Sequence, residues 1–139
     1  MAANTKPIFV LVPNVGQAEV DSANTESDGT GDLDTLFTAG ANGSVVFRIA
    51  YRNAQSSAAA SSAMVIRIFV TDDDGANPRI RSEVALAAAT RSTTVIGSGG
   101  VINYPDGLAL MSGQLLKVGQ SVYAGAQDLM HYTAEGGDF

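Results

Sequence analysis

Residues 44–52 read Ser-Val-Val-Phe-Arg-Ile-Ala-Tyr-Arg, and this stretch decides the fold class. Apolar side chains recur at every second position, on a face made of Val45, Phe47, Ile49 and Tyr51. The opposite face carries Val46, Arg48, Ala50 and Arg52. A period of two is that of a half-buried β-strand. The Asn-Gly pair just before the stretch is a strong turn signal.

Outward from this strand, the same alternation and the turn residues between runs predict an all-β chain. Met64–Thr71 and Ile80–Leu86 alternate in the same way. Shorter β-rich runs occupy Ile8–Val12, Thr93–Ile96, Val101–Tyr104, Leu108–Met111, Leu115–Val118, Ser121–Ala126 and Leu129–Glu135. Turn signals separate them at Gly97–Gly100, Pro105–Gly107, Ser112–Gly113 and Gly119–Gln120. Eight or more short strands without a helical period predict a jelly-roll-like fold or a related antiparallel β-sandwich.

The chain length fits one domain, which we expect to span residues 1–139. Its N-terminal third is acidic, because Pro7 to Phe47 holds no Lys or Arg. We expect an exposed acidic loop over 21–34, where Asn, Ser, Thr, Gly and Asp predominate. The Ala/Ser run at 55–63 is compatible with either a loop or a short helix.

Composition excludes several classes of function. The net charge of −6 disfavours nucleic-acid binding, which draws most of its affinity from basic patches. The absence of cysteine excludes disulfides, thiolate metal sites and cysteine catalysis. No apolar run is long enough to cross a membrane, so we expect a protein made in the cytoplasm. Charged residues are only 16%, which favours a surface partly covered by partners.

The sequence holds no clear catalytic or metal-binding motif. His131 is the only histidine, and no nucleophile motif accompanies it, so we expect an ordinary strand residue. The run Asp72–Asn77 resembles a calcium loop, but its positions 5 and 6 are Ala76 and Asn77, so a charged turn is the better interpretation. A looser calcium site at Asp28, Asp32 and Asp34 stays open. We predict neither an enzyme nor a bound cofactor.

The arginines allow two interpretations. Arg48 and Arg52 project from one predicted strand, Arg67 from the next, and Arg79 and Arg81 from a third. If these strands are neighbours, they form one basic stripe. Such a stripe either keeps the surface solvated and discourages edge pairing, or it joins copies of the chain by charge complementarity.

The C-terminal sequence Thr133-Ala134-Glu135-Gly136-Gly137-Asp138-Phe139 resembles that of small proteins encoded among the head genes of tailed bacteriophages. The opening is similar too, in its β run between Pro7 and Pro13, Ala23-Asn24-Thr25, Asp28-Gly29-Thr30-Gly31 and the segment 38–44. These are turn and terminus patterns that span most of the chain. The resemblance is to capsid decoration, or cement, proteins.

This resemblance implies a structural protein of the virion, made in the host cytoplasm and seated on the outside of the capsid. Its partners would be the major capsid protein and further copies of itself, often as a homotrimer. Short extended arms at 1–6 and 136–139 could add a strand to a neighbour or clamp it. The expected partner-binding residues are Thr5, Lys6, Pro7, Arg48, Arg52, Asp138 and Phe139.

Two other functions compete with this one. A carbohydrate- or receptor-binding module of a phage tail or fibre would use exposed aromatic side chains, yet aromatics are only 6% and Trp is absent. An enzyme on a jelly roll of the cupin kind would need clustered histidines to hold a metal, and one histidine cannot build that site.

Overall fold

The computed structural model describes residues 12–55 and 59–139. Eight strands account for most of this part of the chain, and the one helical element in it is the short 3₁₀ helix η1, Ala126–Asp128. The strands are β1 Val12–Val20, β2 Asp34–Thr38, β3 Ser44–Asn53, β4 Met64–Val70, β5 Arg79–Leu86, β6 Gly99–Leu110, β7 Leu115–Gln120 and β8 Met130–Asp138.

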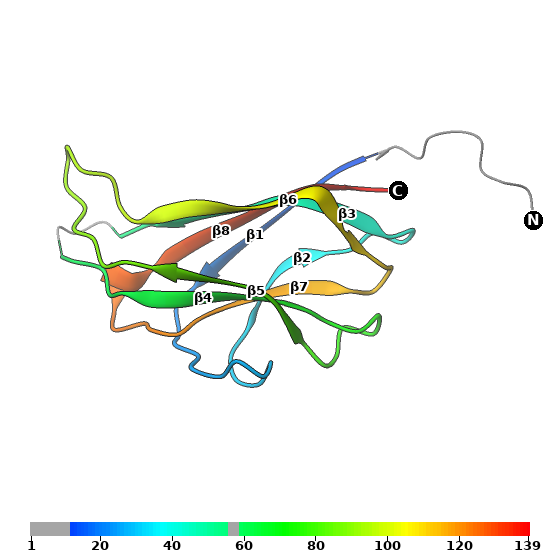
Figure 1. The fold of residues 1–139 in the computed structure, drawn as a ribbon, viewed down its shortest axis with the longest axis horizontal. Coiled ribbons are helices and arrows are strands. Elements are labelled where there is room, and N and C mark those ends of the chain that lie inside the picture. Colours follow the sequence, from blue (N-terminus) through cyan, green and yellow to red (C-terminus); the bar gives the residue numbers. More distant parts are fainter. Residues whose placement is uncertain (1–11, 56–58) are drawn as a thin grey trace, which may run out of the picture.

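The strands form two antiparallel four-stranded sheets, stacked as a sandwich (Figure 1). Sheet A has the order β1-β8-β3-β6, and sheet B has the order β2-β7-β4-β5. The first strand therefore pairs with the eighth, the second with the seventh, the third with the sixth and the fourth with the fifth. Alternate pairs lie in alternate sheets, as in a long hairpin rolled up on itself. The prediction of an all-β jelly roll is confirmed.

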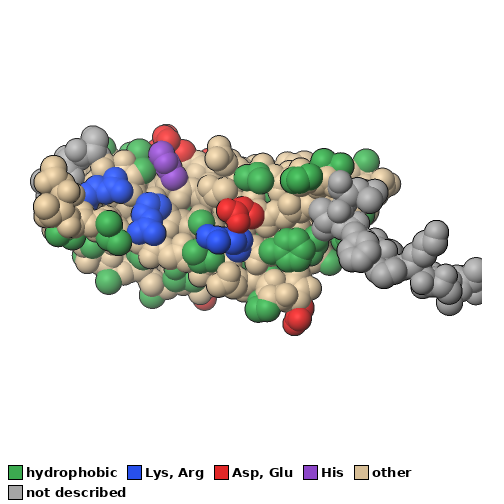
Figure 2. All heavy atoms as spheres, turned by 90° about the horizontal axis from the view of Figure 1, so that it is seen from above, with side chains coloured by type: hydrophobic (Ala, Val, Ile, Leu, Met, Phe, Trp, Pro, Cys, Tyr) green, Lys and Arg blue, Asp and Glu red, His purple; other side chains and the backbone are tan. Residues whose placement is uncertain are grey.

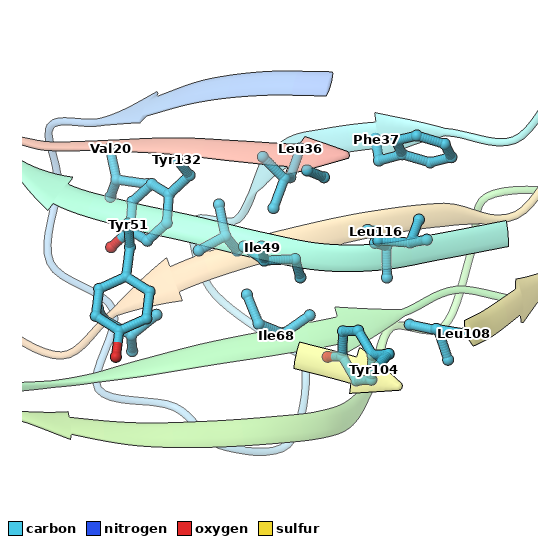
Figure 3. Packing of buried hydrophobic residues seen from close by; sticks show 14 of the residues in the cluster. Val20, Leu36, Phe37, Ile49, Tyr51, Ile68, Tyr104, Leu108, Leu116 and Tyr132 are labelled. Carbon is cyan, nitrogen blue, oxygen red and sulfur yellow. The ribbon is translucent and has the colours of Figure 1, made fainter. Parts of the chain in front are cut away.

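The core lies between the two sheets, and large apolar side chains fill it (Figure 3). Sheet A contributes Val46, Ile49, Tyr132 and Ala134, and sheet B contributes Leu36, Ile66, Ile68, Leu116 and Val118. None of these is more than 1% exposed, and each large side chain contributes about 1.5–3 kcal/mol by leaving water. The buried hydroxyl of Tyr132 donates to Gln120 Oε1 at 3.1 Å, so its polar atom is satisfied.

Strand β3 departs from the simple alternation that its sequence predicts. The pairing of β3 with both β6 and β8 shifts between Val46 and Arg48, which is a β-bulge at Phe47. Val46 is consequently fully buried, whereas Phe47 is 48% exposed. The expectation that Phe47 belongs to the buried face is wrong, because the extra residue in a bulge reverses the alternation on one side of it.

The bulge also explains why Pro105–Gly107 is not a turn between strands. Val46 pairs with Leu108 and Arg48 with Asn103, so the intervening residues of β6 bulge opposite Phe47. Gly107 provides the positive φ, 79°, that this excursion requires. The two short strands expected at 101–104 and 108–111 are therefore parts of the single strand β6, and the predicted turn at Gly97–Gly100 overlaps its first residues.

Three further local predictions are wrong. Thr93–Ile96 is not a strand, because the Ser92 hydroxyl accepts hydrogen bonds from the backbone N–H groups of Thr94 and Val95 and bends the chain. Gly119–Gln120 is not a turn, since Gln120 continues β7 and pairs with Ile66 of β4. Ser121–Ala126 is a loop that leads into η1.

That loop is fixed to the sandwich by a buried carboxylate. Asp128 has no exposed surface, and it accepts hydrogen bonds from the backbone N–H groups of Ser62 and Ala124, each at 2.7 Å. Ser62 belongs to the described part of the Ala/Ser run 55–63, where no helix forms and Ala60 makes an isolated bridge to Thr90. The loop interpretation of that run holds for its described residues.

The C-terminal residues are not a free arm. Gly136–Asp138 belong to β8, an interior strand of sheet A that pairs with β1 on one side and β3 on the other. The Phe139 N–H donates to the Gly43 carbonyl oxygen at 3.2 Å. The expectation of an arm at 136–139 is wrong, because two ladders of hydrogen bonds hold this segment. The arm expected at 1–6 lies outside the described residues.

Candidate functional site

The outward side of sheet A presents three rows of side chains whose positions follow from the strand register. The first row, from β1 to β6, is Val15, Glu135, Arg48 and Asn103. The second is Gln17, Thr133, Ala50 and Val101. The third is Glu19, His131, Arg52 and Gly99. We refer to these positions, together with Phe47 beside the first row, as the open face.

The two sheets differ in how their outward sides are covered. Over sheet B, the loop between β1 and β2 packs its Leu33 side chain against Gly119, and the Asn24 N–H donates to the Gln120 carbonyl at 2.8 Å. Phe69, on the outward side of β4, has no exposed surface. This confirms a loop over most of 21–34, but it is a cover for sheet B as well as an acidic surface.

The open face, by contrast, exposes apolar side chains. Val15 is 57% exposed, Phe47 48% and Val101 41%. Figure 2 shows this side of the molecule, with hydrophobic side chains between charged ones; the purple side chain is His131, the chain's one histidine. These apolar side chains are spread over the face, on β1, β3 and β6, with charged side chains between them. The face is therefore the candidate for binding another protein.

The charges of the open face are ordered across the strands. Both carboxylates, Glu19 and Glu135, lie on β1 and β8, and both arginines, Arg48 and Arg52, lie on β3. Arg48 Nε lies 3.3 Å from Glu135 Oε2, and His131 Nε2 lies 2.9 Å from Glu19 Oε2. All four of these side chains are about half exposed, so the pairs contribute little to stability and remain accessible to a partner.

Arg52 has a different environment from Arg48. Its Nη1 donates to the Gly97 carbonyl oxygen at 3.3 Å, and no carboxylate of the described chain lies within 4.0 Å of its guanidinium. The positive charge of Arg52 is therefore not neutralised locally. Together, Arg48 and Arg52 make the β3 half of the open face basic and leave the β1–β8 half acidic.

The single basic stripe considered from the sequence does not form. Arg48 and Arg52 lie on sheet A, whereas Arg67, Arg79 and Arg81 lie on sheet B, because the chain changes sheets between β3 and β4. Arg67 Nε lies 2.9 Å from Glu83, Arg79 pairs with Asp72, and the Arg81 guanidinium stacks over the Tyr104 ring at 5.8 Å. Of these five arginines, only Arg48 and Arg52 lie on the open face.

Asp138 is engaged within the molecule rather than free for a partner. Its carboxylate accepts hydrogen bonds from the Ser44 hydroxyl and from Asn14 Nδ2, the latter at 2.8 Å. These bonds, the one from Ser44 first, hold the pKa of Asp138 below its usual value. The side chain thus ties β1, β3 and β8 together at one end of sheet A. Thr5, Lys6 and Pro7, the other expected partner-binding residues, lie outside the described part of the chain.

Two of the candidate calcium ligands accept local hydrogen bonds. Asp72 accepts from Asn77 Nδ2 at 2.8 Å, and Asp28 accepts from the Thr30 hydroxyl at 2.6 Å and from the Thr30 backbone N–H at 3.0 Å. These bonds lower the pKa of both carboxyls. Within residues 12–55 and 59–139, no three His, Asp or Glu side chains are grouped so that they could hold a metal ion. The charged-turn interpretation of Asp72–Asn77 describes the observed structure.

Sequence reasoning missed the β1 and β8 side of the open face. Glu19 and Glu135 were not singled out, although Gln17 and Glu19 alternate with Ala18 and Val20. That alternation could have identified the second half of β1 as a strand with an outward carboxylate. The bulge at Phe47, which exposes an aromatic ring, has no comparable signal within β3 itself.

Comparison with known proteins gives no match, whether against protein-family models, curated proteins or solved structures. Among the described residues, none of the helices has the length and apolarity that a membrane span requires. The open face therefore has to be interpreted from its own geometry and from the sequence resemblance.

Proposed function

We propose that this chain is a structural protein that decorates the capsid of a tailed bacteriophage and binds other proteins through its open face. The observation that carries the proposal is the contrast between the two sheets. The chain's own loop covers part of sheet B, in which β5 exposes Ile80, whereas sheet A exposes Val15, Phe47 and Val101 among ordered charges. Its termini and turns resemble those of head decoration proteins. From this resemblance we take the virion as its location and the major capsid protein as its partner.

Such a protein acts by mass action. A domain that binds the assembled, expanded shell and not its separate subunits shifts the equilibrium toward that shell. Each contact can be weak, since many copies occupy one lattice and add through avidity. A rigid jelly roll suits this task, because its sheet face needs little reordering when it meets a partner.

The resemblance also implies a homotrimer seated where capsid hexamers meet. The experiment that tests the proposal is co-sedimentation of the purified protein with capsids of the phage that encodes it, in expanded and unexpanded forms. Pelleting with expanded shells supports decoration. Protein that stays in solution with both forms would contradict it.

One observation favours the alternative of a carbohydrate-binding module, namely the exposed ring of Phe47, on which a sugar could stack. The hollow on the same face does not include Phe47, however. It is lined by Gln17, Glu19 and His131 and encloses about 280 Å³, below the roughly 300–1,000 Å³ of most ligand pockets. Binding to a glycan array that disappears in Phe47→Ala would favour this alternative over decoration.

A further inference from the structure

The charges in the first row of the open face are self-complementary. Glu135 and Arg48 face each other across the two central strands of sheet A, β8 and β3. A two-fold axis that runs parallel to the strands between them exchanges these two positions. In two copies related by this axis, Glu135 of each copy lies over Arg48 of the other, so the contact brings together two pairs of opposite charges.

Other face-to-face arrangements lack this match. A two-fold axis across the strands would place the first row over the third, and would bring Arg48 of one copy over Arg52 of the other. Like charges that meet in an interface weaken binding. Of these two arrangements, the charge pattern therefore favours the first, and its aligned strands match one of the common packings of stacked sheets.

The uncharged side chains agree with the same orientation. The middle row carries Thr133 and Ala50 on the central strands, and small residues there allow the sheets to approach to the usual separation of about 10 Å. The rotation also places the exposed Phe47 of each copy beside the exposed Val15 of the other. Two apolar contacts then flank the charged centre.

The size of the face sets the strength of the pairing. The whole outward side of sheet A, which includes the open face, has four strands about 4.8 Å apart and the nine residues of β1 rising about 3.3 Å each, so it spans roughly 19 by 30 Å. Two such sides bury at most roughly 1,100 Å² in total, just below the range of stable complexes. We propose that the open face binds the open face of a second copy, as a two-fold dimer that dissociates on dilution.

This inference rests on the proposed function only for the use of the open face in protein binding, and it replaces the homotrimer that the resemblance implies with a two-fold dimer. Its test is a charge exchange between chains. In Arg48→Glu homodimers, and equally in Glu135→Arg homodimers, both central pairs become repulsive, and we expect association about tenfold or more weaker than in the unmodified protein. In a dimer of one Arg48→Glu chain and one Glu135→Arg chain, both central pairs are attractive again.

The measurement is solution mass by sedimentation equilibrium from low micromolar to millimolar protein. We expect a monomer–dimer equilibrium for the unmodified protein, mostly monomers for each single variant, and a one-to-one dimer when the two variants are mixed. A chain carrying both changes should again pair with itself. Arg79→Glu, which reverses an exposed arginine of sheet B, is the matched control and should dimerise normally. Circular dichroism checks that every variant is folded.

A mass that stays monomeric at all concentrations, a trimer, or variants that do not associate on mixing would overturn the inference. Co-sedimentation of the same variants with expanded shells distinguishes the dimer from capsid decoration. If Arg48→Glu no longer pellets although the unmodified protein is a monomer, the open face meets the lattice and not a second copy. If the charge exchange works but no variant pellets, the dimer stands and decoration fails.

Discussion

Gly16 lies where the edges of the two sheets meet, and its lack of a side chain lets β1 approach β2. A Cβ added to Gly16 would lie 1.9 Å from the Leu36 carbonyl oxygen, a backbone atom that cannot move aside cheaply. We expect Gly16→Ala to lower the free energy of unfolding by about 2 kcal/mol or more, as overpacking does. Urea denaturation measures this, with Gln17→Ala, an exposed neighbour on the same strand, as the control. Equal stability of the two variants would contradict the close approach.

Asp138 gives the stability a defined dependence on pH. Hydrogen bonds from Ser44 and Asn14 lower its pKa in the folded state below the unfolded value of 3.8. The carboxylate therefore stabilises the fold fully above pH 3.8, and this contribution is lost as the pH falls through the lower, folded pKa.

We accordingly expect Asp138→Asn to be less stable than the unmodified protein at neutral pH, and the difference to shrink in acid. Urea denaturation at a series of pH values from about 7 to about 2 tests this. Asp73→Asn, in the turn between β4 and β5, serves as the matched control for the loss of a single carboxylate and is measured over the same pH range. A difference for Asp138→Asn that stays constant over the whole range would show that the charge plays no part.

At the scale of the element, the bulge in β3 reverses what alternation alone predicts for two adjacent residues. Val46 has no exposed surface, whereas the larger Phe47 is 48% exposed. We expect Val46→Ala to cost about 2 kcal/mol of unfolding free energy through the cavity it leaves. Phe47→Ala should change stability by about 0.5 kcal/mol or less. Thermal or urea unfolding of both variants measures this difference. A larger loss of unfolding free energy for Phe47→Ala than for Val46→Ala would contradict the bulge at Phe47.

The strands that the sequence predicts well are those that the alternation of apolar and polar residues identifies by itself. Ser44–Arg52, Met64–Thr71 and Ile80–Leu86 closely match β3, β4 and β5. The Pro-Asp-Gly at 105–107 has the composition of a hairpin turn but forms a bulge within β6. Whether this sequence forms a hairpin turn or a bulge depends on its pairing with β3, which lies far from it in the chain. Local turn signals cannot distinguish the two structures.

The same distinction applies to the candidate site. The outward position of Arg48 and Arg52 follows from the alternation in β3, whereas their partners depend on topology. Glu135 reaches Arg48, and Glu19 reaches His131, only because the jelly roll places β8 between β1 and β3. Likewise, Arg67, Arg79 and Arg81 lie on sheet B because the chain changes sheets after β3. The residue pattern of a single strand does not show which sheet the strand joins.

At the scale of the whole molecule, the chain's own loop covers part of one sheet, whereas the outward side of the other is open. The strand count predicted the sandwich, but this asymmetry depends on the path of residues 21–33 along sheet B. In the proposed function the open side binds other proteins. A decoration protein would then gain its effect from repetition on a lattice, where weak contacts add.

The proposed function is tested by co-sedimentation of the unmodified protein with purified capsids of a tailed bacteriophage that encodes it. We expect saturable pelleting with expanded shells, in fixed proportion to the major capsid protein, and no pelleting with unexpanded shells. Protein that remains in the supernatant at every concentration with expanded shells would contradict the account. Equal pelleting with both forms would contradict the stabilisation of the expanded state.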